Sequence, residues 1–600
     1  MKMLPNENRI FYLLIIIALV SVFFIPTLYI GDGSEYFGIL VSLYYHGSLE
    51  LTDQDVIKGI EILNDFHFDE KKGYFPALSG RLYSFHFWMY PLVCYPVFLL
   101  LQLFHCKLLS VFIITNTLLM LLLCWWILFK VNNCLRYRLC LLSIALINPI
   151  LLYVPWSHPE VYIYVFVFIG LLEFMEKRFF LSLFLLCFAS LQAPPLLLIP
   201  GIITLYLIAK KIIPPQKYWR LAVANAIGLL PMAFYWFHYG TWSLLAASGV
   251  AKLEYMSWTK VINLLFDPNF GLVIYYPILF AVILFQVFIK DRLAIYGLGI
   301  MLLIVFSMTS QVNWNPGVMY ISRYAVWLIP IVIVVVCRYL AGLKNKSLAA
   351  ILAGYLLTTG IFTVVCAYEY RWDNAMSFLP QTRWLLRHAP AFYNPPFKVF
   401  VERAIGQHFN DIIPIETQIK DFLPIQLYDQ DGLRKELALN SRGELEYRNG
   451  GAKWHSGELY CFSNLPNQFP QISLHGITDP RTSFGTGWYK PENDNQGYFW
   501  RWMATRSSIG LIAPTPADAV AFDMQIRSYF RPRQFAVYLN ETKVFEKEIS
   551  TLTHISFQGN LRKGINSLTF VSREPAESPR ENLESLDSRR LTFAIGQDLQ

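Results

Sequence analysis

Three features of the chain indicate a polytopic α-helical membrane protein that carries a C-terminal β-sandwich or jelly-roll domain. The composition is 55% hydrophobic and only 15% charged, which is too apolar for an average soluble protein. The apolar residues form uninterrupted runs long enough to cross a bilayer. After about residue 440 the pattern changes to short alternating runs broken by Gly, Asn and Pro, which is typical of a β-sandwich.

Nine apolar runs are long enough to span, and two further apolar stretches are shorter or interrupted. The nine runs are 10–30, 108–129, 137–154, 160–175, 219–238, 272–289, 293–310, 324–340 and 347–369. Lys and Arg clusters after several runs mark cytoplasmic ends by the positive-inside rule. An odd number of crossings must separate an outer segment from a cytoplasmic one. By this count, 86–104 is expected to be an interfacial or re-entrant helix, and 179–209 a hairpin of two short helices folded at Pro194 and Pro195. We therefore expect about eleven transmembrane helices, with the C-terminus outside.

The first run also indicates where the protein resides. Lys2 and Arg9 precede it, and no small-residue cleavage site follows it, so we interpret it as a retained signal anchor. The expected location is the plasma (inner) membrane, where the lipid bilayer is one partner of a multi-pass chain. The net charge of +8 is what cytoplasmic Lys and Arg supply, so no nucleic-acid partner is needed to explain it.

The predicted topology places most polar residues on the outer face. The outer segments are 31–85, with a short interfacial helix after Ser34, then the turn at 157–160, residues 239–271, residues 311–323 and the chain after 370. The expected domains are a transmembrane domain over 1–369, a helical connector over 370–440 and an extracytoplasmic β-sandwich over 441–600. Any chemistry is therefore expected on the outer face.

Two carboxylates, Asp32 and Glu35, lie where the first run ends, in the stretch LYIGDGSEYFGILVSLYYHGSLEL from Leu28 to Leu51. Acidic groups at the mouth of a membrane helix are costly to desolvate, which favours a functional role. The spacing also matches a helix-capping box, with Asp32 as N-cap and Glu35 bonded back to its amide. Both explanations stay open at this point.

Cations that could hold an anion occur at the same face. Arg323 follows the outer loop QVNWNPGVMYIS, and Arg81 closes the first outer segment. A guanidinium suits bidentate phosphate contact, although Arg323 could instead extend to the membrane interface. His158, in the turn WSHPE, and Tyr320 are further candidate substrate contacts. Asp53 and Asp55 could complete a divalent-metal site with Asp32, but a solvated acidic loop is the simpler explanation.

Several of these stretches resemble the C-type superfamily of integral membrane glycosyltransferases (GT-C), which use polyprenyl-phosphate sugars. The similar segments are GDGSEYFGILVSLYYHGSLEL, WSHPEVYIYVF, FGLVIYYPIL and WNPGVMYISRYAVWLIP. The chain is most similar to bacterial mannosyltransferase-like and rhizobial-lipopolysaccharide-type members. FGTGWYKPE, YFWRW and SLDSRRLTFAI resemble the β-sandwich module that some members carry.

The resemblance implies a function that the residues alone do not. It implies that Asp32 is the catalytic base, with Glu35 as its assistant or a metal ligand. Gly33 stands where a second neighbouring acid would follow Asp32, so we assign no metal, and a divalent metal stays open. The expected activity moves a sugar from a polyprenyl-phosphate donor to a hydroxyl or amine of a glycan, lipid or protein acceptor. The alternative is a non-enzymatic lipid or polysaccharide transporter, or a membrane-anchored glycan-binding protein.

Overall fold

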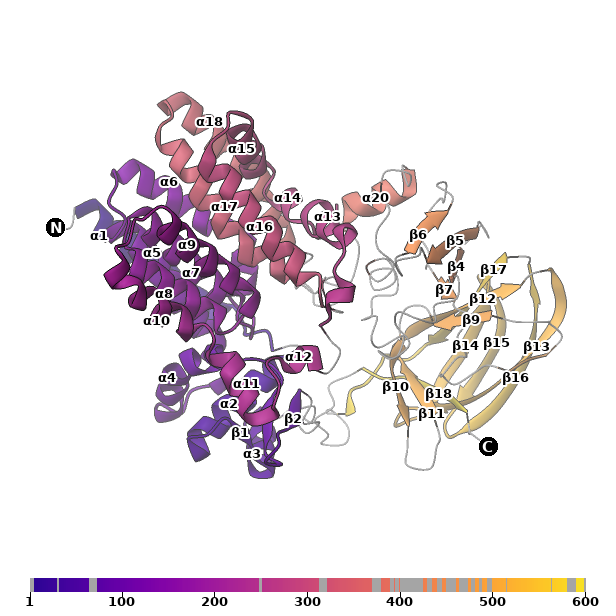
Figure 1. Ribbon diagram of the computed structural model, residues 1–600. Coiled ribbons are helices and arrows are strands. Elements are labelled where there is room, and N and C mark those ends of the chain that lie inside the picture. The colour runs from indigo at the N-terminus through magenta and orange to yellow at the C-terminus, as the bar shows by residue number, and fades with distance from the viewer. Residues whose placement is uncertain are drawn as a thin grey trace. The chain divides into compact units, whose positions relative to one another are not determined.

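The computed structural model divides the chain into two compact units, Met1–Tyr370 and Arg371–Gln600, which we describe separately (Figure 1). The boundary lies beside residue 369, where the transmembrane domain was expected to end. In the first unit the structure describes residues 5–29, 32–63, 73–247, 251–311, 314 and 321–368. In the second it describes short segments between 379 and 493, then 499–513, 515–562, 564–579 and 590–597.

The first unit is mainly helical because its apolar runs satisfy their backbone groups internally (Figure 1). Its first helices are α1 (Pro5–Phe24), α2 (Gly33–His46), α3 (Asp53–Leu63), α4 (Met89–Leu103), α5 (Val111–Phe129), α6 (Leu135–Leu146), α7 (Glu160–Met175), α8 (Phe179–Ser190) and α9 (Leu198–Ala209). The later ones are α10 (Tyr218–Ile227), α11 (Leu230–Tyr239), α12 (Leu244–Ala247), α13 (Trp258–Phe266), α14 (Leu272–Tyr275), α15 (Pro277–Phe288), α16 (Arg292–Met308), α17 (Arg323–Ala341), α18 (Asn345–Tyr355) and α19 (Ile361–Tyr368). Strands β1 (Glu50–Leu51), β2 (Tyr74–Pro76) and β3 (Leu82–Ser84) form a small sheet in the order β1-β3-β2.

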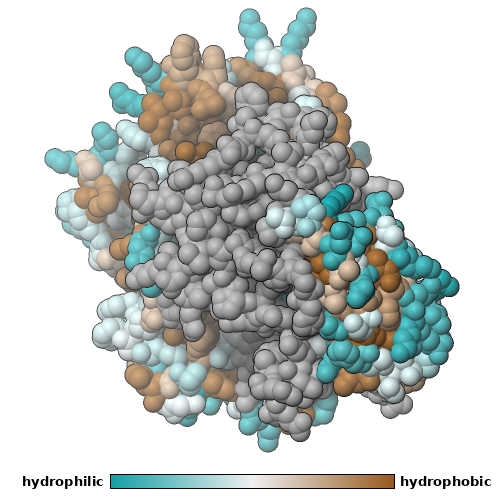
Figure 2. Space-filling view, turned by 90° about the vertical axis from the view of Figure 1, so that its right-hand side faces the viewer, coloured by the Kyte–Doolittle hydropathy of each residue, from teal (hydrophilic) through white to brown (hydrophobic). Residues whose placement is uncertain are grey.

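Several apolar helices of the described residues could span a membrane. Four are long and apolar enough, namely Asn6–Phe24, Leu108–Phe129, Arg323–Ala341 and Asn345–Val365, and α10 with α11 add a fifth if this pair, bent by 55°, is one span. Other apolar helices have only 10–17 residues. Large apolar side chains are exposed on these helices, such as Phe23 at 85% and Phe288 at 82%, and Figure 2 shows apolar patches on the surface. Both features agree with contact to lipid.

Several of the spans expected from the sequence are broken in the described residues, so the expected count of about eleven crossings stays a prediction. Run 137–154 ends its α-helix at Leu146 and continues as a 3₁₀ helix, Pro149–Tyr153. Run 272–289 breaks before Pro277, which begins α15. The expected hairpin over 179–209 is present as α8 and α9, separated by the 3₁₀ turn Pro194–Leu197. Proline within an apolar run therefore interrupts the helix without changing hydropathy.

Asn148 satisfies the backbone at one of these breaks. Its side-chain amide nitrogen donates to the carbonyl oxygens of Ile144 at 2.9 Å and Ala145 at 2.7 Å. Its amide oxygen accepts from the backbone N–H of Ile150 at 2.9 Å and from the hydroxyl of Tyr276 at 3.3 Å. Asn148 is fully buried, so these groups have no access to solvent. One side chain thus replaces the hydrogen bonds that the broken helix loses.

We expect Asn148→Ala to destabilise the first unit by roughly 2–4 kcal/mol, because it removes several buried hydrogen bonds and takes away the acceptor of the buried Ile150 N–H. The midpoint of thermal unfolding in detergent should fall by roughly 5 °C or more. Asn133→Ala is the matched control, because Asn133 is exposed and bonds only the next backbone amide, that of Cys134, at 2.8 Å. Equal midpoints for the two variants would contradict this role of Asn148.

Helix α2 is more enclosed than the interfacial helix expected within 31–85. Most of its residues from Gly33 to Ser42 are buried, and exposure begins only near its C-terminal end, at Tyr44 and Tyr45. It packs against α3 and α4. Helix α4, in the stretch 86–104 that was expected not to cross the membrane, has 15 residues and contains Pro96. Helix α2 therefore belongs to the packed core of the unit.

The second unit is rich in β-strands (Figure 1). Its elements are α20 (Pro380–His388), β4 (Ile425–Tyr428), β5 (Arg434–Leu439), β6 (Leu445–Arg448), β7 (Tyr460–Phe462), β8 (Ser473–His475), β9 (Arg481–Phe484), β10 (Trp488–Asn493), β11 (Phe499–Met503), β12 (Arg506–Ala513), β13 (Ala517–Ser528), β14 (Arg533–Leu539), β15 (Thr542–Ile549), β16 (Thr553–Leu561), β17 (Gly564–Ser572) and β18 (Phe593–Gln597). The helical connector predicted for 370–440 is wrong over β4 and β5, where alternating polar and apolar residues form an antiparallel pair.

Two larger sheets carry the buried residues of this unit. One has the order β10-β11-β18-β13-β16, with β8 also paired to β13, and the other has the order β15-β14-β17-β12-β9. One apolar cluster receives side chains from both sheets, including Phe522 and Ile526 from β13 and Phe535 and Val537 from β14. The alternating pattern seen in the sequence thus corresponds to strands with one buried face. The more specific sandwich or jelly-roll fold stays a prediction.

Candidate functional site

Asp32 lies at the N-cap position of α2, but its carboxylate does not cap the helix. Its backbone carbonyl accepts from the N–H groups of Glu35 at 3.1 Å and Tyr36 at 3.3 Å, and no side-chain cap hydrogen bond is formed. The side chain is 25% exposed. Glu35 likewise does not bond back to Asp32 in the manner of a capping box. The carboxylates are therefore used elsewhere.

The partner of Asp32 is Arg323, which begins α17. One terminal nitrogen of the guanidinium, Nη1, lies 3.1 Å from Oδ2 of Asp32, although 291 residues separate the two. The turn before Arg323 is held by a side chain from another segment: the Tyr153 hydroxyl donates to the carbonyl of Ile321 at 2.8 Å. The Arg323 side chain is only 16% exposed and is directed toward Asp32. The sequence hypothesis that placed both residues in one site agrees with this contact.

His158 joins the same cluster from the turn before α7. Its ring stacks on Trp156 with centroids 4.0 Å apart, and its side chain is 2% exposed. Nδ1 lies 3.8 Å from Oδ2 of Asp32 and 3.4 Å from Nη1 of Arg323. Ser157, beside it, crowds Gly33 so closely that a Cβ at Gly33 would collide with the Ser157 side chain. Glycine is therefore required where α2 begins.

His86 is a site residue that the sequence analysis did not identify. Its Nδ1 lies 2.9 Å from Oε2 of Glu35, and its Nε2 lies 3.4 Å from Oδ2 of Asp32, so the imidazole lies between the two carboxylates. Ser84, two residues earlier, donates to the same Glu35 oxygen at 2.9 Å. Gly73 faces the Glu35 carboxylate at φ +83°, and a Cβ there would collide with it. The signal in the sequence was slight: a His two residues after a Ser, just beyond the acidic segment 31–85.

Burial and the neighbouring charges shift the pKa values of the residues in this cluster. Burial would raise the pKa of Asp32, but His86, His158 and Arg323 outweigh burial and hold this pKa well below its usual range. Burial also raises the pKa of Glu35, with His86 opposing. Burial would lower the pKa of His86, but Asp32 and Glu35 raise it to about 9. At neutral pH the site therefore holds an ionised Asp32 beside a charged imidazolium.

We expect the contribution of His86 to stability to fall as pH rises from 6.5 to about 9. The folded protein binds this proton more tightly than the unfolded chain, so the stabilisation is complete below pH 6.5 and is lost through about pH 9. The difference in melting temperature between the unmodified protein and His86→Gln should shrink over this range. A difference that grew with pH would contradict a charged His86. His105→Gln, at an exposed position, is the control.

Asp32, Glu35 and His86 also fit a divalent metal by residue type and spacing, since their ligand atoms lie within 4.8 Å of one another. The imidazole, however, presents a different nitrogen to each carboxylate. A metal would therefore have to displace the proton that His86 shares with the acids. These three residues would hold such an ion, which would supply a positive charge next to Arg323. The other acids proposed for a metal site act locally, since Asp55 caps α3 through Thr52 and pairs with His46 at 2.8 Å.

Two other predicted site residues are not brought into this cluster. Arg81 is 61% exposed and lies 3.5 Å from Glu50, so the structure does not support its role as a phosphate ligand of the Asp32 site. Its place on the β2–β3 hairpin directs it to the surface. Tyr320 lies outside the described residues.

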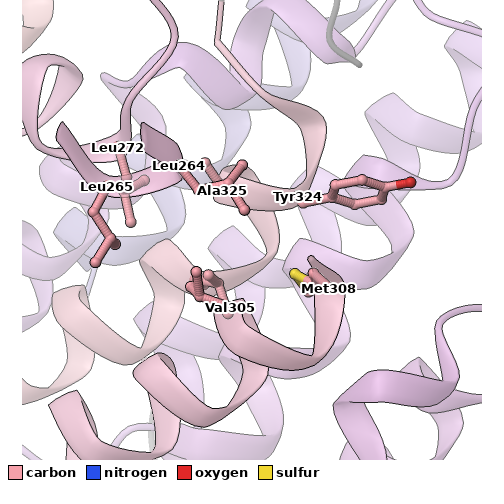
Figure 3. A pocket seen from close by; sticks show the side chains of 8 residues that line it. Leu264, Leu265, Leu272, Val305, Met308, Tyr324 and Ala325 are labelled. Atoms are coloured by element: carbon pink, nitrogen blue, oxygen red, sulfur yellow. The ribbon is translucent and has the colours of Figure 1, made fainter. Parts of the chain in front are cut away.

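An apolar pocket lies next to Arg323 on the same helix (Figure 3). Its lining comes from α13, α14, α16 and the first turns of α17, and it contains Leu264, Leu265, Leu272, Val305, Met308, Tyr324, Ala325 and Leu328. Figure 3 shows the leucines of α13 and α14 on one side, with Val305 and Met308 of α16 beneath Ala325 and Tyr324. Only Tyr324 brings a polar atom, and its hydroxyl donates to Gln311 at 2.6 Å. A charged site and an apolar pocket therefore adjoin at the start of α17.

Comparisons with known proteins add little to this description. No protein-family model matches the chain, and no curated protein is similar to it. A solved structure, the native family 35 carbohydrate-binding module from Clostridium thermocellum, is similar with 13% sequence identity and a TM-score of 0.15. The match covers 21% of this chain and 96% of that module. At this TM-score it carries no argument about fold or function.

Proposed function

We propose that the protein is a glycosyltransferase that moves a sugar from a polyprenyl-phosphate carrier to a hydroxyl or amine of a glycan, lipid or protein acceptor. The observation that carries this proposal is the contact of Asp32 with Arg323. It joins a carboxylate that can accept a proton to a guanidinium that can bind a phosphate, at 3.1 Å. The acceptor of such a transfer needs a group that takes its proton, and the donor needs a group that binds its phosphate.

The proposed roles follow from the positions of the side chains. Asp32 takes the proton of the acceptor as its oxygen or nitrogen attacks the anomeric carbon, and the sugar is transferred with inversion. Arg323 stabilises the charge that develops on the leaving phosphate. His86 and His158, both within 3.8 Å of Asp32, orient the carboxylate. Glu35 in turn orients His86 by the 2.9 Å contact.

The surroundings of the site are compatible with a lipid-linked donor. A polyprenyl chain is apolar and would lie against the apolar side chains beside Tyr324 and Ala325, which would have to move apart to admit it, when its phosphate is bound at Arg323. We place this site on the outer face of the plasma membrane, in a topology of about eleven crossings in which broken helices complete the bundle. The β-rich C-terminal unit would then lie outside the cell membrane, where it recognises glycan or positions the acceptor.

A transfer assay tests the proposal against its alternatives. Purified protein in lipid nanodiscs would be incubated with radiolabelled undecaprenyl-phosphate sugars and with envelope glycans, lipids and proteins as acceptors. We expect label to pass to one acceptor class, with release of undecaprenyl phosphate. Binding of labelled donor without transfer would favour a glycan-binding protein. Movement of the labelled lipid between the leaflets of a vesicle, again without transfer, would favour a transporter.

A further inference from the structure

Several buried polar atoms without hydrogen-bond partners belong to Arg323 itself or to residues within two or three positions of Arg323 and His158 in the sequence. Among the residues that the structure describes, they include both carboxylate oxygens of Glu160, the hydroxyls of Ser157 and Ser322, and Nε of Arg323. Buried polar groups in folded proteins are normally paired, so such a concentration needs an explanation. A polar ligand bound by these groups would explain it, and the proposed function already requires a polar ligand at this site, the lipid-linked sugar.

Glu160 is the most unusual member of this group. It is the first residue of α7, two positions after His158, and is 1% exposed. Arg323, Asp32 and His86 all interact with it electrostatically, so it belongs to the same site. A carboxyl group buried at this depth, with no hydrogen bond to another described residue, is costly and contributes nothing to packing that an apolar side chain would not supply.

A lipid-linked sugar has three parts, the phosphate, the apolar chain and the sugar ring, and the chemistry of Glu160 suits the sugar ring. A carboxylate repels the phosphate, which Arg323 can bind instead. The apolar chain has no donors to offer. The sugar ring, which is bonded directly to the phosphate, carries hydroxyl groups that donate hydrogen bonds, and Glu160 offers two acceptor oxygens. Ser157, three residues before Glu160, adds a hydroxyl that can both donate and accept.

Resting on the proposed function, we infer that Glu160, with Ser157, forms the subsite that binds the hydroxyl groups of the donor sugar and so determines which monosaccharide is accepted. A site built to hydrogen-bond a hydroxyl strongly rejects an analogue that lacks it, because the buried group is then left unpaired. Glu160 is thus a binding residue for the sugar, separate from the phosphate contact at Arg323. Its loss should change which donor binds and leave the lipid phosphate contact intact.

Equilibrium binding in nanodiscs tests this inference with two kinds of probe: undecaprenyl phosphate alone, and undecaprenyl phosphate that carries glucose, galactose or mannose. We expect the unmodified protein to bind one sugar-bearing carrier at least about tenfold more tightly than the bare carrier. Glu160→Gln should lose most of this preference while its affinity for the bare carrier stays within about twofold. Glu160→Asp, which keeps the acceptor oxygens, should retain part of the preference.

The control is Glu254→Gln, which makes the same change at an exposed carboxylate on an outer segment. Thermal unfolding of each variant establishes that it is folded. The inference is overturned if Glu160→Gln keeps the full preference, if it weakens both kinds of carrier equally, or if the unmodified protein prefers no sugar-bearing carrier. Failure of the proposed function is a different result, in which the unmodified protein and Arg323→Met bind the bare carrier equally well.

Discussion

Asp32→Asn should reduce sugar transfer at least about 10³-fold, because it removes the group that accepts the acceptor's proton. An amide cannot act as a general base, yet it has nearly the same shape as the carboxylate. The affinity for undecaprenyl phosphate should not fall, since Arg323 then loses a competing anion at 3.1 Å. The measurement is the rate of label transfer at saturating donor, together with donor affinity.

Asp53→Asn is the matched control for this experiment, because Asp53 is an exposed acid on the same outer segment and should leave the rate within about twofold. Thermal unfolding should show both variants to be folded. If Asp32→Asn transferred sugar at a near-normal rate, the base would have to be another group. Glu35 would then be the first to examine, because it is linked to Asp32 through His86.

Arg323→Met should weaken binding of undecaprenyl phosphate by roughly 30- to 1,000-fold, because truncating a buried charge partner costs about 2–4 kcal/mol. Methionine keeps much of the length and apolar character of the side chain but removes the guanidinium. Arg81→Gln should bind the lipid phosphate normally, because Arg81 is exposed and pairs with Glu50 away from the site. Equal losses in the two variants would contradict the placement of the phosphate at Arg323.

A double variant separates the effect on substrate from the effect on the protein itself. Arg323→Met leaves Asp32 without its guanidinium partner, so part of any loss of stability should disappear when Asp32→Asn is added. We expect the sum of the losses of stability in the two single variants to exceed the loss in the double variant. Additive changes would show that the 3.1 Å contact contributes little to the folded protein.

The apolar runs predicted where helices would form because hydropathy is a local property. Run 160–175 corresponds to α7, and the hairpin over 179–209 corresponds to α8 and α9. The breaks were harder to predict: Asn148 and Pro149 lie inside an apolar run, and only the partners of Asn148 show why the helix can end there. The count of about eleven crossings therefore stays a prediction, since four helices of the described residues are long and apolar enough to span without a break.

The site was predicted in part, and the missing part has a physical cause. Asp32 and Arg323 stand out in the sequence because charges at membrane-helix ends are unusual. His86 does not, because a single His beside an apolar stretch has no pattern of its own, and it becomes a site residue only when β3 brings it between two carboxylates. Arg81 carries a guanidinium that could bind phosphate, but the hairpin directs its side chain to the surface, where it pairs with Glu50.

The sequence by itself determined that the first unit is mainly helical and apolar and that most strands come after it, because length, hydropathy and periodicity are local properties of the chain. Only the tertiary structure decided that Asp32 pairs with Arg323 and not with its own helix, and that His86 joins them. Contacts across 291 residues depend on how helices pack, and packing depends on every side chain between them.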